Sequence, residues 1–387
     1  MLNIKMGVAK AGIKPSGDED ILVLSFKPSY YSAVFTQNSL AAAPVIYDRQ
    51  IIKQTEKISA IVVNSGNANA ATGKKGLENA KKMAELVAKN LNIPTGEVLV
   101  FSTGVIGVQL PMDKVERGIN EACKNLQDLD LEKAARAIMT TDSFPKYYSS
   151  SSDINGKRFF VVGIAKGAGM IHPNMATMLA YIFTDLDIDK STLDKLMGEI
   201  TQKSFNSIDV DGCESTNDSF VIVSTGESGI KVGKDNIQLV KEELEKAAVE
   251  LAKMIVKDGE GATKLIQINV HSAKDNIEAK RVGEAISLSN LFKTAMFGND
   301  PNWGRILSAV GQLHLDIDFS KVKLYLGDFL LYDGEPKDFD REAASEYLKT
   351  HKEVVIDLYL NRGEGEWTYY TCDLTYEYIR INAEYTT

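Results

Sequence analysis

Apolar segments of strand length alternate along this chain with amphipathic segments of helix length, and this alternation constrains the fold more than any other feature. The apolar segments, several of which end in a polar or glycine-containing turn, are predicted as strands at 20–26, 57–66, 97–107, 157–170, 178–185 and 219–226. The amphipathic segments are predicted as helices at 74–92, 189–208 and 236–261, and the segment 129–142 is predicted to be helical at its start. Strands and helices in this mixture pack as layers, so the sequence predicts an α/β fold with layered sheets, not a helical bundle or a barrel.

The sequence changes character near residue 280. Beyond this point the segments are alternating, aromatic and β-branched, as antiparallel strands are. We therefore predict a smaller, β-rich C-terminal lobe over 281–387. The chain has 387 residues, 44% of them hydrophobic, which is enough to bury a large core in two lobes.

Charge and residue spacing argue against several classes of protein. The net charge is -9 and no Lys/Arg cluster is dense enough to follow a phosphate backbone, so nucleic acid is not an expected partner. The three cysteines and four histidines lie far apart, without CxxC or HExxH spacing, so no metal site is predicted. The loop "GIAKGAG" departs from GxGxxG and no P-loop is present, so no nucleotide cofactor is predicted either.

The sequence also bears on the cellular location. No stretch approaches the ~18 uninterrupted apolar residues of a membrane-spanning helix, and the first residues lack the apolar core of a signal peptide. We therefore expect a soluble cytoplasmic protein that has reduced thiols and no membrane partner.

Thr177 stands in "GMIHPNMATML" (169–179), directly after the small Ala176 and before an apolar segment. A threonine hydroxyl is a poor nucleophile unless a base takes its proton, and no His, Asp or Glu adjoins it here. One known solution is the residue's own α-amino group, whose ordinary pKa is about 7.7–8.0. That solution requires Thr177 to be a chain N-terminus. From these two residues alone, the simpler interpretation is a threonine that opens a strand.

Nine blocks of sequence bear on this question, and one of them contains Thr177. They are "SAVFTQN" (32–38), "NSGNANAATG" (64–73), "STGVIG" (102–107), "MTTDSFPK" (139–146), "KGAGMIHPNMATML" (166–179), "SFNSIDVDG" with "STND" (204–218), "DGEGATK" (258–264), "GNDPNWGR" (298–305) and the terminal "INAEYTT". With these blocks in this order, the chain resembles the ornithine acetyltransferase family (glutamate N-acetyltransferase, the ArgJ family) along nearly its whole length.

The resemblance implies an acyltransferase of arginine biosynthesis that cuts itself between Ala176 and Thr177. The products would be an α chain (1–176) and a β chain (177–387) that stay associated, as α2β2 in the family. Thr177 would then take the acetyl group from N2-acetyl-L-ornithine and pass it to L-glutamate in a ping-pong reaction. No cofactor is implied, and the use of acetyl-CoA as a second donor is left open.

The resemblance also implies a layered αββα sandwich of the ornithine acetyltransferase/DmpA type. Residues 1–176 and 177–280 would build the sandwich together. The lobe at 281–387 would return its C-terminal tail to the active site.

The same resemblance assigns roles to named residues. Thr103 and Gly104 in "STGVIG" would form the oxyanion hole, where a hydroxyl and a backbone N–H face the developing charge. Lys166 would meet a substrate carboxylate and Glu260 a substrate ammonium group, because both substrates are amino-acid derivatives. The remaining implied substrate-binding residues are Thr141, Thr177, Asn382 and Thr387. Thr140 adjoins Thr141, and the sequence does not decide between the two.

Two other functions fit the same residues. The first is an aminopeptidase or amidohydrolase with the same N-terminal nucleophile, in which water replaces glutamate as the acyl acceptor. The second is a binding protein that is never cut. Product analysis separates the first from the acyltransferase, and the mass of the purified polypeptide separates the second.

Overall fold

The computed structural model describes residues 2–172 and 178–384. These residues form two compact units. The first unit holds the described residues up to Asn206 together with Cys213–Ile255, and the second holds Ser207–Gly212 and the described residues from Val256 onward. The second unit thus begins earlier in the chain than the boundary predicted near residue 280.

The first unit contains one large sheet and six of the helices among the described residues. Its strands are β1 (Lys5–Ala9), β2 (Ile21–Phe35), β3 (Lys57–Asn67), β4 (Val98–Val105), β5 (Gln127–Asp128), β6 (Lys146–Ile154), β7 (Lys157–Lys166), β8 (Leu179–Thr184) and β9 (Ser219–Ser224). Its helices are α1 (Ala43–Ile51), α2 (Gly73–Leu91), α3 (Met112–Lys124), α4 (Leu131–Ile138), α5 (Lys190–Lys203) and α6 (Ile237–Lys257), of which α6 ends in the second unit. The strand order is β4-β3-β2-β9-β8-β7-β6; in addition, β1 pairs with β2, and β5 pairs with β1.

The sheet of the first unit folds over on itself to make two facing layers. In a flat sheet β4 and β8 would lie about 19 Å apart, since four strand spacings separate them. Instead the rings of Phe101 on β4 and Tyr181 on β8 are 5.1 Å apart, and those of Phe26 on β2 and Phe183 on β8 are 5.6 Å apart. The side chains between the layers therefore form the core of a sandwich.

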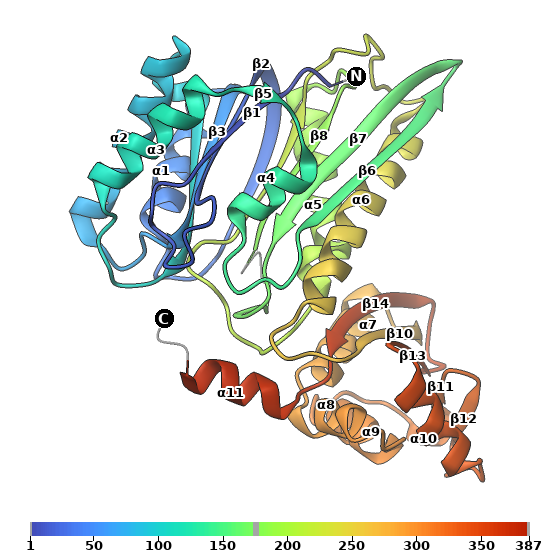
Figure 1. The fold of residues 1–387 in the computed structure, drawn as a ribbon. Coiled ribbons are helices and arrows are strands. Elements are labelled where there is room, and N and C mark those ends of the chain that lie inside the picture. The colour runs from blue at the N-terminus through green and yellow to red at the C-terminus, as the bar shows by residue number, and fades with distance from the viewer. Residues whose placement is uncertain (1, 173–177, 385–387) are drawn as a thin grey trace. The chain divides into compact units, whose positions relative to one another are not determined.

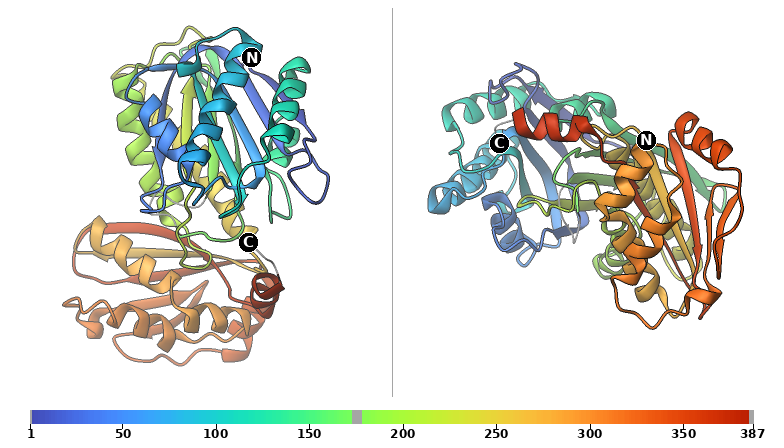
Figure 2. Two further views of the ribbon diagram at one scale, coloured as in Figure 1. Left: turned by 90° about the vertical axis from the view of Figure 1, so that its left-hand side faces the viewer. Right: turned by 90° about the horizontal axis from the view of Figure 1, so that it is seen from below.

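Helices cover both outer faces of this sandwich (Figures 1 and 2). One group, α1, α2 and α3, lies on the side of β3 and β4, and the other, α5 and α6, lies on the side of β7 and β8. Close packing on the second side is visible at Gly163 of β7, where an added Cβ would come within 2.9 Å of Leu251 on α6. The layers are thus helix, sheet, sheet and helix, which confirms the predicted αββα fold.

The central strands of the sheet are wholly buried, and this explains why their sequences are continuously apolar. Every residue of β8 and of β9 is buried. The two strands run parallel to each other, and β8 is antiparallel to β7 while β9 is antiparallel to β2. A strand with neighbours on both edges and side chains on two covered faces has no solvent face to make polar.

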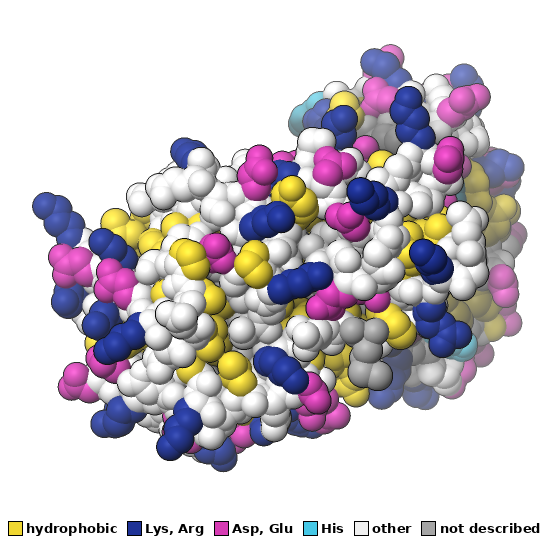
Figure 3. Space-filling view, turned by 90° about the horizontal axis from the view of Figure 1, so that it is seen from above, with side chains coloured by type: hydrophobic (Ala, Val, Ile, Leu, Met, Phe, Trp, Pro, Cys, Tyr) yellow, Lys and Arg dark blue, Asp and Glu magenta, His cyan; other side chains and the backbone are white. Residues whose placement is uncertain are grey.

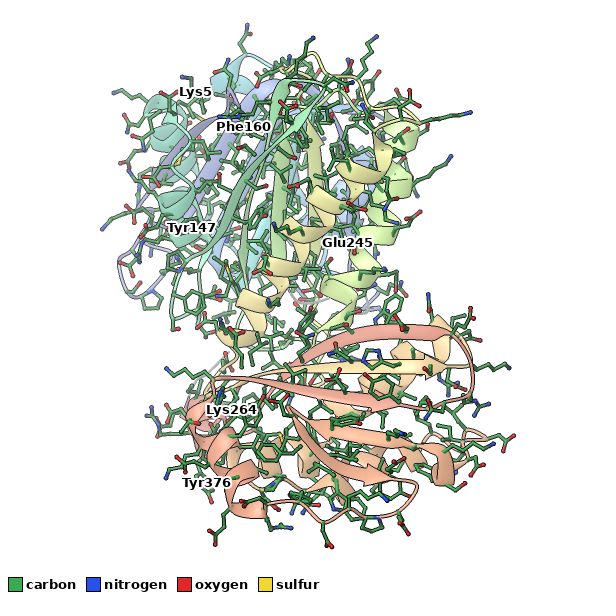
Figure 4. All side chains as sticks on the ribbon, turned by 90° about the vertical axis from the view of Figure 1, so that its right-hand side faces the viewer. Lys5, Tyr147, Phe160, Glu245, Lys264 and Tyr376 are labelled. Carbon is green, nitrogen blue, oxygen red and sulfur yellow. The ribbon has the colours of Figure 1, made fainter. Side chains whose placement is uncertain are left out.

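The second unit has its own sheet and core. Its strands are β10 (Leu265–Ala273), β11 (Lys323–Leu326), β12 (Phe329–Asp333), β13 (Glu353–Tyr359) and β14 (Gly365–Cys372), in the order β12-β11-β13-β10-β14. Its helices are α7 (Asn276–Ser287), α8 (Asn290–Phe297), α9 (Trp303–Gly311), α10 (Arg341–Thr350) and α11 (Tyr376–Glu384). Figure 4 labels Tyr376 at the start of α11, and Tyr147, Phe160 and Glu245 on β6, β7 and α6 of the first unit.

The predicted β-rich lobe differs from this unit in two respects. The observed unit includes β10 and α7, because β10 pairs in parallel with β13 and antiparallel with β14 at the centre of the sheet. It also contains helices between its strands, whose apolar faces pack with Ile268 and Leu358 in one hydrophobic core.

A buried ion pair holds Ser207–Gly212 in the second unit. The Lys293 ammonium donates to Asp209 Oδ2 at 2.8 Å and to Thr371 Oγ1 at 3.0 Å. Asp209 and Lys293 are almost fully buried, so removing one partner would leave an uncompensated buried charge.

The described cysteines form no disulfide, and they differ in environment. Cys213 is exposed, whereas burial raises the pKa of the Cys372 thiol to about 12 and that of Cys123 to about 11. The raised pKa leaves almost no thiolate at pH 8. We expect iodoacetamide at pH 8 to alkylate Cys213 at least about 100-fold faster than Cys372, as read by peptide mass spectrometry.

Alkylation in guanidinium chloride is the control for this experiment, because all three thiols should then react at similar rates. Equal labelling of Cys372 and Cys213 in the folded protein would contradict the buried position of Cys372.

The surface of the molecule carries both signs of charge. On the face drawn in Figure 3, Lys and Arg side chains are interspersed with Asp and Glu side chains. Among the described residues, no helix is both long enough and apolar enough to cross a membrane.

Candidate active site

Thr103 and Gly104 lie at the end of β4, where this strand runs parallel to β3. The Thr103 side chain is buried, and Gly104 has a φ of +133°. A Cβ at Gly104 would lie 2.3 Å from the carbonyl carbon of Gly66 and 2.5 Å from the backbone nitrogen of Asn67. Only glycine therefore permits this approach of the two strands.

Lys166, the last residue of β7, joins Thr103 to a second threonine. Its ammonium group donates to Thr103 Oγ1 at 3.1 Å and to Thr140 Oγ1 at 2.8 Å. The three residues come from the end of β4, the loop after α4 and the end of β7, so the fold brings together segments that lie far apart in the chain. We call Thr103, Thr140, Lys166 and Asp142 the Lys166 cluster.

Asp142 is the anion of the Lys166 cluster, and its side chain is wholly buried. It accepts hydrogen bonds from Lys146 Nζ at 2.7 Å, the Gly167 backbone N–H at 2.7 Å and the Thr140 backbone N–H at 2.9 Å. Its Oδ2 also lies 3.9 Å from Lys166 Nζ. Burial alone would raise the pKa of Asp142, but the Lys166 and Lys146 ammonium groups outweigh burial and hold that pKa well below its usual range. Asp142 is therefore ionised at neutral pH.

The paired threonines of "MTTDSFPK" occupy different environments. The Thr140 hydroxyl accepts from Lys166, and the Thr140 backbone N–H donates to Asp142. Thr141, the predicted substrate ligand, is half-buried between Thr140 and Asp142 in the same loop. Its side chain has no hydrogen bond among the described residues.

Ala176 and Thr177, the predicted cleavage pair, lie outside the described residues, as does Thr387. Of the described residues that follow Thr177, Leu179–Thr184 belong to β8. Leu179, two residues after Thr177, is the cross-strand partner of Lys166 in the β7–β8 ladder. The strand that follows Thr177 thus starts beside the Lys166 cluster.

Asp218 is a second buried carboxyl in this region that sequence reasoning did not single out. It is 2% exposed, and its Oδ2 has no hydrogen-bond partner among the described residues. Burial raises the pKa of Asp218 well above its usual range, although nearby Lys166 and the hydrogen bond from the Met178 backbone N–H oppose that rise. Asp218 is therefore a weaker acid than an exposed aspartic acid, and it lies next to the residue that follows Thr177.

The other two predicted substrate-binding residues lie in the second unit, where they contact each other. Asn382 Nδ2 donates to Glu260 Oε2 at 2.8 Å, although 122 positions separate the two residues in the chain. Gly261 makes the contact possible, since a Cβ there would lie 2.5 Å from the backbone nitrogen of Tyr378 on α11. The Lys166 cluster and the Glu260–Asn382 pair thus belong to different units.

Among the described residues, no group of three or more His, Cys, Asp or Glu side chains could hold a metal ion. What the Lys166 cluster offers instead is a buried ammonium group and two threonine hydroxyls beside a glycine turn. Such groups stabilise an oxyanion when they are held in place before the reaction. This arrangement suits an enzyme that stabilises an oxyanion, as enzymes of the acyl-transfer class do.

Comparison with known proteins identifies the family. A family model of the ArgJ family matches residues 5–387, and the chain belongs to this family. The arginine biosynthesis bifunctional protein ArgJ of Aquifex aeolicus is 50% identical over 100% of both chains. The protein of the same name from Caldanaerobacter subterraneus subsp. tengcongensis is 46% identical over 97% of this chain and 95% of its own.

One solved structure adds to this comparison. The crystal structure of arginine biosynthesis bifunctional protein ArgJ from Bacillus halodurans is 38% identical with a TM-score of 0.52, and the match covers 53% of this chain and 98% of that chain. The resemblance seen in the sequence blocks is thus confirmed. Family membership makes the chain an acyltransferase with a role in arginine biosynthesis.

Proposed function

We propose that this enzyme transfers the acetyl group of N2-acetyl-L-ornithine to L-glutamate through an acetyl ester on Thr177. The observation that carries the proposal is the cross-strand pairing of Lys166 with Leu179, because it sets the Lys166 cluster beside the strand that follows Thr177. An ester on Thr177 would form next to a hydroxyl and an ammonium group already in position.

The first step of the proposal is self-cleavage. Thr177 Oγ attacks the Ala176 carbonyl carbon and loses its proton to a base, the C–N bond breaks, and the Thr177 nitrogen takes up a proton. Water then hydrolyses the ester and leaves a free α-amino group on Thr177. That group, with an ordinary pKa of about 7.7–8.0, is the base which the sequence around Thr177 lacks.

Acetyl transfer follows with the same groups. The Thr177 amine takes the hydroxyl proton as Oγ attacks the acetyl carbon, and ornithine leaves with that proton. The neutral glutamate amine then attacks the ester carbonyl, the bond from that carbon to Thr177 Oγ breaks, and the proton lost by the amine passes through the Thr177 amine to Oγ, which restores the hydroxyl. In both halves the negative charge on the carbonyl oxygen would be stabilised by the Thr103 hydroxyl and the backbone at Gly104.

Charge complementarity guides our assignment of the remaining contacts. We assign a substrate carboxylate to Lys166 and a substrate ammonium group to Glu260, because a buried or half-buried charge is best matched by its opposite. Thr141, Asn382 and Thr387 complete the proposed binding residues. On the family's account alone, we also propose that the α and β chains remain together as α2β2 in the cytoplasm.

Replacing Glu260 by glutamine tests the ammonium contact. Glutamine keeps an oxygen that can accept from Asn382 but loses the negative charge. We expect KM for N2-acetyl-L-ornithine, whose δ-ammonium group stays free, to rise about 10- to 100-fold with kcat little changed, as measured by steady-state acetyl transfer. Glu377→Gln on α11 is the matched control, since Glu377 pairs with the exposed Arg380, and it should leave KM unchanged. An unchanged KM in Glu260→Gln would remove Glu260 from the binding site.

The decisive experiment for the whole proposal is an assay of purified protein with N-acetylornithine and glutamate. We expect N-acetylglutamate as the product. Free acetate with no N-acetylglutamate would instead favour a hydrolase of the same fold. The name "bifunctional" of the relatives makes acetyl-CoA a second donor to test in the same assay.

A further inference from the structure

The Lys166 ammonium group donates hydrogen bonds to two threonine hydroxyls at once. Lys166 Nζ lies 3.1 Å from Thr103 Oγ1 and 2.8 Å from Thr140 Oγ1. An ammonium group can only donate, so both hydroxyl oxygens act as acceptors toward it. A hydroxyl has a single proton, which in each threonine must therefore point away from Lys166.

We propose that Lys166 is a positioning residue that turns the Thr103 hydroxyl into a fixed donor toward the acyl oxygen, with Asp142 as the anion that holds Lys166 in place. This inference rests on the proposed function, because it concerns the same oxyanion. It adds to the charge contact with substrate a second task for Lys166, which acts through Thr103.

The direction of the Thr103 proton matters for the rate. A free hydroxyl rotates about its C–O bond and must lose that freedom when it donates to an oxyanion. A hydroxyl that already accepts from Lys166 has lost that rotational freedom before the reaction starts. An oxyanion donor is most effective when its orientation is fixed in advance. Thr103 is buried, so few water molecules compete for its proton.

Asp142 gives the Lys166 cluster its rigidity. Its hydrogen bonds to the Gly167 and Thr140 backbone N–H groups fix the residue after Lys166 and the residue that carries the second hydroxyl. The same carboxylate faces the ammonium groups of Lys146 and Lys166.

A double-mutant cycle tests the link between Lys166 and Thr103. Thr103→Val, Lys166→Met and the double variant are compared with wild type by kcat of acetyl transfer at saturating substrate, calculated per cleaved β chain. We expect Thr103→Val to lower kcat by about 10²–10³-fold and Lys166→Met by about 10- to 100-fold. In the Thr103→Val background, Lys166→Met should lower kcat by no more than about threefold. Additive losses would overturn the inference.

Thr103→Ser keeps the test decisive if Thr103→Val does not fold or is not cut. Serine retains the hydroxyl, so Lys166→Met in this background should lower kcat by the same factor as in wild type. Loss of that sensitivity would contradict the inference. Lys280→Met is the control for removing a half-buried lysine, since Lys280 lies over the Trp367 ring in the second unit, and it should leave kcat unchanged.

The outcomes separate this inference from the proposed function. If wild type makes no N-acetylglutamate, the proposed function fails and the cycle has no reaction to report on. If wild type makes it and the cycle is additive, only the positioning role of Lys166 fails, and Lys166 remains a contact to the substrate carboxylate.

Discussion

Replacing Thr177 by alanine is expected to leave the chain as one polypeptide and to abolish acetyl transfer. Alanine has no hydroxyl to attack the Ala176 carbonyl and none to carry the acetyl group. By analogy with nucleophile deletions in other enzymes that use covalent catalysis, kcat should fall by at least about 10⁴-fold. Intact mass spectrometry reads the cleavage, and N-acetylglutamate formation reads the transfer.

Thr177→Ser is the matched control for this substitution. Serine keeps a hydroxyl at the same position and should still be cut, although the lost methyl group alters how the hydroxyl is held. Wild-type protein that stays whole and still makes N-acetylglutamate would show that no new N-terminus is needed. Full activity in Thr177→Ala would show that the nucleophile lies elsewhere.

Replacing Gly104 by alanine should produce the second large loss. The new Cβ would come within 2.3 Å of a backbone carbon of β3, which no rotation of a side chain can relieve. The ends of β3 and β4 must then move apart, and Thr103 moves with them. We expect kcat to fall by at least about 10²–10³-fold, the cost of losing an oxyanion donor, together with a lower Tm.

Gly107→Ala separates the clash from the backbone strain. Gly107 also has a positive φ, +82°, but no atom lies within 4 Å of a Cβ placed there. Alanine at this position would introduce backbone strain from the positive φ but no steric clash, so kcat should stay close to that of wild type. Equal losses in the two variants would mean that the contact with β3 has no part in activity.

Local patterns in the sequence were sufficient to predict most of the first unit. The helix predicted at 74–92 is α2, and the continuous apolar segments at 178–185 and 219–226 are the fully buried β8 and β9. The segment 129–142, predicted to be helical at its start, is helix from Leu131 to Ile138. The residues after Ile138 instead turn into the loop that carries Thr140 and Asp142, where backbone N–H groups bond to a carboxylate and not to a helix.

The second unit was harder to predict because its sheet depends on distant partners. β10 precedes residue 280, but its neighbours β13 and β14 begin at Glu353 and Gly365. No local sequence pattern predicts that β10 pairs with strands so far along the chain. The helices α7, α8, α9 and α10 were not predicted, because aromatic and β-branched segments dominate the sequence around them.

Some residues of the candidate site could be named from the sequence, but their contacts with residues far along the chain could not. Family blocks pointed to Thr103 and Lys166, and the structure joins them. Asp142 and Lys146 stood in a quoted block, but a carboxylate and an ammonium group in a sequence look like ordinary surface charges until their burial is known. The contact between Asn382 and Glu260 depends on α11 returning to the loop at Gly261, which no spacing in the sequence reveals.

The strand order has a practical consequence for anyone who purifies this protein. β8 and β9 follow Thr177 in the chain, yet each is hydrogen-bonded to a strand that precedes Thr177. β8 pairs with β7, and β9 pairs with β2. Cleavage of the backbone after residue 176 would therefore not separate the two fragments. They would elute together from a gel-filtration column and dissociate only in denaturant. Halves expressed from separate genes would have to fold in each other's presence, because neither could complete the sheet by itself.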